Sequence, residues 1–191
     1  SLAVRSIAAG RRVYVPGDPK GEWAAVADAV GGTVVSLGHG LTTRLNPLDP
    51  GPPPRGHESA AWVSLVRGRR LRLLSAVAEL TLGRELHPVE HGALDAALAV
   101  VEQNNVPTIP DVLRALTDPD GAAAAADGTT AAERVSDGRD LAHALRRLVR
   151  GDLAGMFDGP STEQLDASAP MVVLDLSRIG AVTTKSSPVP A

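Results

Sequence analysis

The feature that most constrains the fold is a strand–helix–strand pattern between residues 11 and 37. Residues 11–16 (Arg-Arg-Val-Tyr-Val-Pro) form a β-branched and aromatic run that is too short for a helix. Apolar side chains then recur at helical spacing over residues 23–30, and residues 33–37 are again β-branched. Two strands joined by a helix through short connections predict a βαβ unit, and therefore a parallel sheet.

The rest of the chain predicts a helical block followed by a return to the sheet. A Gly/Pro-rich connection leads to predicted helices, and the residues around 118–130 are interpreted as a low-complexity loop. The predicted helices cover residues 58–82, 88–101, 110–116 and 131–149. A third strand, of the buried parallel kind, covers 171–175. The tail at 183–191 is expected to be disordered. We therefore divide the chain into an α/β core segment (1–56), a helical insertion (57–157) and a return to the core with its tail (158–191).

The composition excludes several chemistries. The 191 residues contain no cysteine, which excludes disulfides, thiolate zinc sites and cysteine nucleophiles, and favours a reducing cytoplasm. Lys and Arg number 19 against 22 Asp and Glu, so the net charge of −3 gives no support to nucleic-acid binding and does not exclude it. The longest apolar stretches are shorter than the roughly 20 residues that a membrane-spanning helix needs.

Residues 87–91 (His-Pro-Val-Glu-His) match the H-x-x-E-H motif of inverted zinc proteases. In that motif both imidazoles lie on one helical face and bind zinc. Proline, however, belongs at the first helical position, which places His87 at the helix cap with non-helical dihedral angles. We therefore interpret this segment as a helix start and expect no metal.

Nucleotide motifs are also absent or weak. The chain contains no G-x-x-x-x-G-K-[ST] sequence, whose glycine amides and lysine would hold the phosphates of a nucleotide. The strand at 171–174 followed by Asp175 has the form of a Walker B strand. Any buried parallel strand that ends in aspartate has the same form, so this pattern alone favours a structural role.

A turn with polar side chains follows the first predicted strand. Asp18, Lys20 and Glu22 stand at the carboxyl end of that strand, the edge where α/β folds bind ligands. The same residues also suit a plain turn and helix start, because Asp18 before Pro19 favours a bend and Glu22 complements the helix dipole. The residues alone leave both interpretations open.

Taken together, several segments resemble the conjugative-transfer motor ATPases of type IV secretion systems, which have a RecA-like P-loop ATPase core. The resemblance rests on residues 13–15 leading into Asp-Pro-Lys-Gly-Glu-Trp at 18–23, on Leu-Asn-Pro-Leu-Asp at 45–49, and on residues 155–162 and 172–177. Order and spacing agree along nearly the whole chain. Two departures are the Pro-Gly pair before Asp18 and the end of the sequence, which does not resemble the family's next helix.

This resemblance implies an α/β fold in which a partial RecA-like parallel sheet carries a large all-helical insertion. It places the chain between the Walker A and Walker B motifs of a parent ATPase that binds ATP and Mg²⁺. We expect the chain alone to bind neither tightly and to be inactive. The implied partners are other copies in a hexameric ring and components of the secretion channel, at the cytoplasmic face of the membrane.

The resemblance also implies where the site residues lie. The nucleotide-proximal or subunit-interface motif would consist of Asp18, Lys20, Gly21, Glu22, Asn46, Asp49 and Asp175.

An alternative function is a non-catalytic helical module that docks a protein partner. Its best feature is the basic cluster within residues 58–82, with Arg67, Arg69 and Arg70 as the expected partner-binding residues. Such arginines also occur on solvated helix faces, where their stems cover apolar neighbours.

Overall fold

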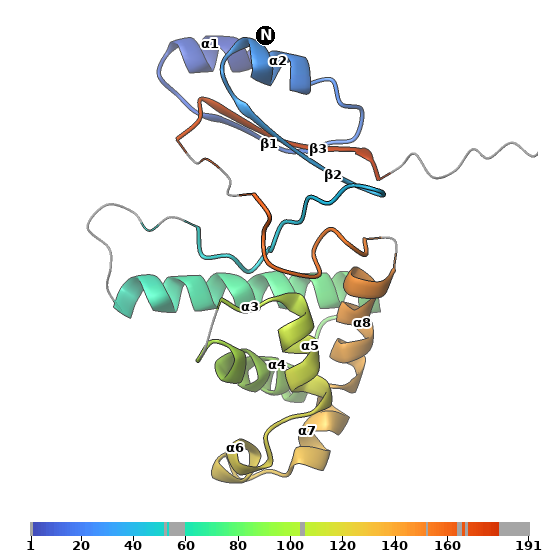
Figure 1. Ribbon diagram of the computed structural model, residues 1–191. Coiled ribbons are helices and arrows are strands. Elements are labelled where there is room, and N and C mark those ends of the chain that lie inside the picture. Colours follow the sequence, from blue (N-terminus) through green and yellow to red (C-terminus); the bar gives the residue numbers. More distant parts are fainter. Residues whose placement is uncertain are drawn as a thin grey trace, which may run out of the picture. The chain divides into compact units, whose positions relative to one another are not determined.

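The computed structural model describes residues 2–51, 53, 60–103, 106–151, 153–163, 166 and 168–179. These residues form two compact units (Figure 1). The sheet unit combines the described residues of Ser1–Leu45 and Ser161–Ala191, and the helical unit is Asn46–Pro160. The predicted tail at 183–191 and the first residues of the predicted helix at 58–82 lie outside the described residues.

The sheet unit contains a three-stranded parallel sheet, as the strand–helix–strand pattern predicted. Its strands run in the order β1-β3-β2, so the strand that comes last in the chain fills the central position. Its elements are α1 (Leu2–Ala8), β1 (Val13–Asp18), α2 (Ala24–Ala29), β2 (Thr33–Gly38) and β3 (Met171–Arg178).

Helices α1 and α2 lie on the same side of this sheet (Figure 1). Between them and the strands, Ala27, Met171 and Val173 are fully buried, and Ile7 and Trp23 pack against this cluster. The backbone of the α2–β2 connection lies very close to β3, because a Cβ at Gly32 would lie 2.7 Å from the carbonyl oxygen of Met171. Burial of each large aliphatic side chain contributes about 1.5–3 kcal/mol to folding stability, so packing against α1 and α2 stabilises β3.

The helical unit has an aliphatic core. Its helices are α3 (Ala60–Leu82), α4 (Pro88–Val101), α5 (Ile109–Thr117), α6 (Gly121–Ala126), α7 (Ala131–Asp137) and α8 (Arg139–Arg150). The side chains of Leu74, Leu94, Leu98, Leu141 and Leu145 are almost completely buried at its centre.

Helix α4 has the bounds and the cap that the sequence predicted. His87 is its N-cap, in extended conformation, and Pro88 occupies the first helical position.

The predicted continuous helix at 131–149 is wrong, because Gly138 ends α7 and begins α8. The predicted loop at 118–130 is wrong as well: it contains α6, in which the amides of Ala122 and Ala123 donate to the Asp120 side chain at 2.7 and 3.1 Å. Alanine has the highest helix propensity, so a capped alanine run forms a helix without an apolar stripe.

The two chain junctions of the sheet unit lie side by side. The Arg44 amide donates to the Thr162 hydroxyl at 3.0 Å, and the Thr162 amide donates to the Arg44 carbonyl at 3.0 Å. The chain therefore leaves the sheet unit and re-enters it at one place. The described residues that follow Leu45, 46–51 and 53, belong to the helical unit.

No helix within the described residues is long and apolar enough to cross a membrane.

Candidate functional site

The carboxyl ends of the three strands meet at one edge of the sheet, because all three strands are parallel. At this edge Asp18 of β1 is in register with Asp175 of β3, and Ser36 of β2 is in register with Asp175 on its other side. Open parallel sheets bind their ligands at this edge. The sheet therefore brings together two of the carboxylates that the sequence singled out.

Asp18 organises the turn that follows it. Its side chain is 3% exposed, and its two oxygens accept the backbone amides of Lys20 at 3.3 Å, Gly21 at 2.9 Å and Trp23 at 2.8 Å. A carboxylate with several amide donors fixes a loop strongly, because charged hydrogen bonds are stronger than neutral ones. Asp18 thus holds the entry into α2 in place.

Gly21 gives this turn its shape. Its φ of +71° lies in the left-handed region that favours glycine. A Cβ placed there would be 3.6 Å from the Ser177 side chain and 3.8 Å from an Asp175 oxygen. The turn after β1 therefore lies directly beside the end of β3.

Asp175 is held as a carboxylate by its neighbours. It accepts the Ser177 amide at 2.9 Å and the Ser36 hydroxyl at 3.1 Å. Hydrogen bonds from the Ser177 amide and side chain, and then from Ser36, together with the nearby Arg178 charge, lower the pKa of Asp175 despite its partial burial. Ser36 carries no local signal in the sequence that would mark it as a site residue, because it lies 139 positions from its partner.

Lys20 and Glu22 are the exposed members of the turn. Neither side chain forms a hydrogen bond or ion pair with any residue that the structure describes. An ammonium group at the carboxyl edge of a parallel sheet is free to meet a phosphate or a partner's carboxylate. By contrast, the oxygens of Asp18 and Asp175 already have donors within the chain.

These residues do not fit a magnesium site. No group of three or more metal-ligating side chains occurs among the described residues. Mg²⁺ requires oxygen ligands in near-octahedral geometry, and Asp18 and Asp175 use their oxygens to fix backbone.

Asn46 and Asp49, the other two residues expected at the site, belong to the helical unit. Asn46 is 3% exposed; its amide group donates to the Asp49 carboxylate and to the Pro107 carbonyl, both at 3.0 Å, and its oxygen accepts the Leu48 amide at 3.1 Å. These bonds fasten the Asn-Pro-Leu-Asp segment to the start of α5. In this structure both residues stabilise a loop.

Two arginines of the basic cluster of α3 form ion pairs within the helical unit. Arg67 bonds Asp95 at 2.7 Å and Glu102 at 2.6 Å, and Arg70 bonds Glu102 at 2.6 Å and the Leu48 carbonyl at 2.8 Å. Burial opposes the charge on Arg67, but the hydrogen bonds to these acids outweigh it, so its pKa is raised.

Arg69 differs from its two neighbours. It is exposed, and its guanidinium carbon lies 5.3 Å from the centre of the Trp62 ring, within the range of a cation–π contact. Of the three arginines expected to bind a partner, it is the one that forms no ion pair with the described residues.

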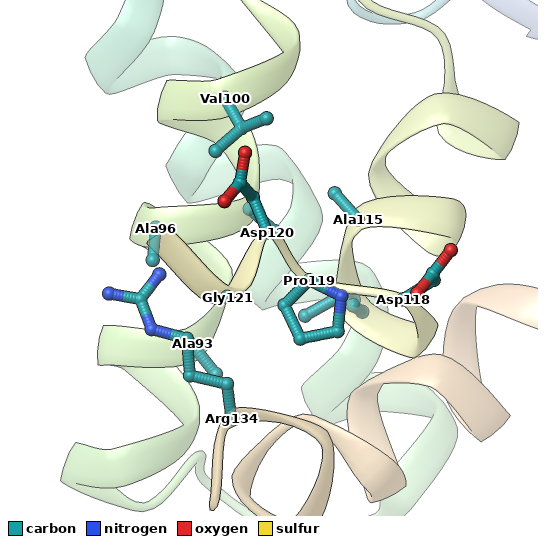
Figure 2. A pocket seen from close by; sticks show the side chains of 11 residues that line it. Ala93, Ala96, Val100, Ala115, Asp118, Pro119, Asp120, Gly121 and Arg134 are labelled. Atoms are coloured by element: carbon teal, nitrogen blue, oxygen red, sulfur yellow. The ribbon is translucent and has the colours of Figure 1, made fainter. Parts of the chain in front are cut away.

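The helical unit also contains a cavity of about 300 Å³ (Figure 2). Small side chains of α4 and α5 line it, including Ala93, Ala97 and Ala115, together with the charged side chains of Asp118 and Arg134. Arg134 is paired with Asp127. None of the site residues expected from the sequence lines this cavity.

Comparison with known proteins supports the class of fold that this geometry defines, an α/β domain with a parallel sheet and a helical unit. No protein-family model matches the chain, and no curated protein matches it. A solved structure, that of VirB4 of Thermoanaerobacter pseudethanolicus, is similar over 95% of this chain and 46% of its own, with a TM-score of 0.60 and 20% sequence identity. The chain therefore shares the fold of somewhat less than half of that VirB4 structure.

Proposed function

We propose that this chain is part of a motor ATPase of a type IV secretion system. The main support is the likeness to VirB4, which extends over 95% of the chain and includes both the sheet unit and the helical unit. The sequence motifs at 18–23 and 45–49 resemble the same kind of ATPase independently of the fold comparison.

In this proposal the sheet unit is a partial RecA-like core and the helical unit is its insertion. The parent protein binds ATP and Mg²⁺ and works as a ring of copies with secretion-channel components at the cytoplasmic face of the membrane. The chain alone hydrolyses no ATP, because it contains no G-x-x-x-x-G-K-[ST] sequence to hold the phosphates.

The turn at 18–23 has a defined part in this proposal. Asp18 and Gly21 fix its backbone, and Lys20 and Glu22 extend from it with no partner among the described residues. We assign Lys20 and Glu22 to contacts with the nucleotide or with the next subunit, and Asp18 to the positioning of both.

Calorimetric titration of Mg-ATP tests the proposal. The chain is compared with a longer polypeptide extended at its amino end, where the family carries its phosphate-binding loop. Binding by the longer polypeptide alone supports the proposal. Micromolar binding by this chain alone contradicts our placement of the nucleotide site, and no binding by either contradicts the ATPase assignment.

A variant pair then tests the turn. Lys20→Ala in a polypeptide extended at both ends, so that it includes the Walker A and Walker B motifs, is expected to lower the ATPase rate at least tenfold, whereas Arg11→Ala is expected to leave it unchanged. Arg11 is an exposed cation that precedes β1, at the opposite edge of the sheet. Equal rates in both variants would remove Lys20 from the site.

A further inference from the structure

Helix α8 (Arg139–Arg150) buries one face in the core of the helical unit. Leu141, Ala142, Ala144 and Leu145 are at most 4% exposed and pack in the centre of the helical unit. This face fixes the rotation of the helix, and therefore fixes which side chains point outward.

The outward face carries a row of basic side chains. Arg139, His143, Arg146 and Arg150 follow one another at intervals of four, three and four residues. At about 100° per residue they fall within an arc of about 60°, and they extend over about 16 Å along the axis. Arg147 lies beside this row. We call these five residues the α8 basic stripe.

Among the described residues, no acidic side chain forms an ion pair with this stripe. Arg139, Arg147 and Arg150 are exposed, and none of them forms an ion pair with a residue that the structure describes. Arg146 contacts the His143 ring at 3.2 Å. The acid on the same helix, Asp140, is bound by Arg84 at 2.9 Å.

Most other described arginines of the helical unit behave differently, with Arg69 and Arg72 as exceptions. Arg67, Arg70, Arg84 and Arg134 all have carboxylate partners inside the unit. The four arginines of the α8 basic stripe are thus a local positive charge on a chain whose net charge is −3. Composition alone could not indicate this concentration of charge.

The chemistry of the stripe selects among anionic partners. A helix that binds at a membrane surface inserts an apolar face, but the apolar face of α8 is already buried in the core. An acidic peptide would need an apolar anchor for a stable complex, and the stripe offers none. A regular line of cations suits the regular line of charges on a phosphodiester backbone.

We propose that the α8 basic stripe binds the phosphate backbone of a nucleic acid duplex without regard to base sequence. Helix α8 contains no Phe, Tyr or Trp on which unpaired bases could stack, so a single strand is expected to bind no more tightly than a duplex. This inference goes beyond the proposed function, because ATP binding at the sheet does not require α8. The two can fail separately.

Fluorescence anisotropy with the full chain tests the inference. The probes are two labelled DNA duplexes of unrelated sequence, each of about 20 base pairs. Three phosphate contacts predict a salt slope of about −2.7, which weakens binding on the order of 40-fold between 50 and 200 mM salt. We expect both duplexes to bind equally within about twofold.

The decisive comparison is between two triple variants. Arg139→Gln/Arg146→Gln/Arg150→Gln is expected to abolish the salt-dependent binding. The control, Arg5→Gln/Arg11→Gln/Arg72→Gln, removes the same charge from exposed positions outside the stripe. It is expected to bind the duplexes with the same salt dependence as the parent chain. Circular dichroism checks that both variants retain their helices, and a triple Arg→Lys variant of the stripe is expected to bind like the parent chain.

Three outcomes would overturn the inference. One is the absence of duplex binding by the parent chain. Another is an equal loss in the control variant, which would assign binding to overall charge. The third is stripe-dependent binding to vesicles that contain phosphatidylserine together with no binding to DNA. None of these outcomes alters the result of the Mg-ATP titration.

Discussion

The buried carboxylate of Glu90 gives the sharpest stability prediction. Its side chain accepts both terminal nitrogens of Arg84, at 2.7 and 2.8 Å, and the backbone amide of His87 at 2.7 Å. The residue is only 4% exposed. The hydrogen bonds from Arg84, followed by the His87 amide, outweigh burial and lower the pKa of Glu90 from 4.5 to about 2.

This depression sets the size and the sign of the effect. Each pKa unit corresponds to about 1.4 kcal/mol, so the ionised Glu90 contributes about 3 kcal/mol of folding stability at neutral pH. Because the pKa is lowered in the folded state, the contribution is complete above pH 4.5 and is lost as the pH falls toward 2.

The perturbation is Glu90→Gln. Glutamine at this position can still accept the His87 amide as part of a capping box, so the substitution isolates the ion pair with Arg84. Urea denaturation at pH 7 should show a loss of about 3 kcal/mol in the free energy of unfolding. The difference in the free energy of unfolding between this variant and the parent chain should be smaller than at pH 7 by roughly 1 kcal/mol at about pH 4, and by roughly 2 kcal/mol at about pH 3.

Glu85→Gln is the matched control, since Glu85 is exposed and precedes the same helix. It should change stability by less than about 0.5 kcal/mol at any pH. A loss of less than about 1 kcal/mol in Glu90→Gln at pH 7, or a loss that does not depend on pH, would refute the reasoning from charge.

Three further substitutions test local features by the same unfolding assay. Asn46→Ala should cost about 2 kcal/mol, because it leaves the Pro107 carbonyl and the Leu48 amide without their buried partner; a loss under about 0.5 kcal/mol would contradict this. Gly21→Ala should cost about 1–2 kcal/mol, since its φ of +71° disfavours a side chain, and no loss would show that the turn relaxes freely. Gly92→Ala should instead stabilise the chain by about 0.5–1 kcal/mol, because Gly92 is exposed within α4 and an added Cβ meets no atom within 4 Å; destabilisation would contradict the helix assignment.

The sequence predicted the elements whose signals are local. The strands at 13–18 and 33–38 were found because short β-branched runs are bounded by turn residues. The start of α4 was found because Pro88 fixes the first helical position. Helix α6 was missed because an alanine run has no apolar stripe, and its signal was the cap at Asp120.

Features that depend on distant partners were beyond the reach of local patterns. The central position of β3 in the sheet follows from pairing with strands far away in the chain. Likewise, Arg67 and Arg70 lie within a basic cluster in the sequence, and only the fold brings Glu102 to them. At the candidate site the sequence identified Asp18 and Asp175, but the Ser36 and backbone donors that occupy their oxygens come from the fold.

The spacing of the α8 basic stripe, by contrast, was readable in the sequence. Arg139, His143, Arg146 and Arg150 recur with the period of a helix, on the side opposite the leucines that identified the helix.

The pair of hydrogen bonds between Arg44 and Thr162 has a consequence for how this protein can change over time. Because these bonds hold Arg44 and Thr162 together, the chain between them is a closed loop that starts and ends at one place in the sheet unit, whatever its length. The entropy of closing a loop grows only slowly with its length, so insertions and deletions within the helices cost the sheet little. Relatives are therefore expected to vary most in the size of this unit while keeping the same two anchor points, and an exchange of whole helical units between them should leave the sheet intact.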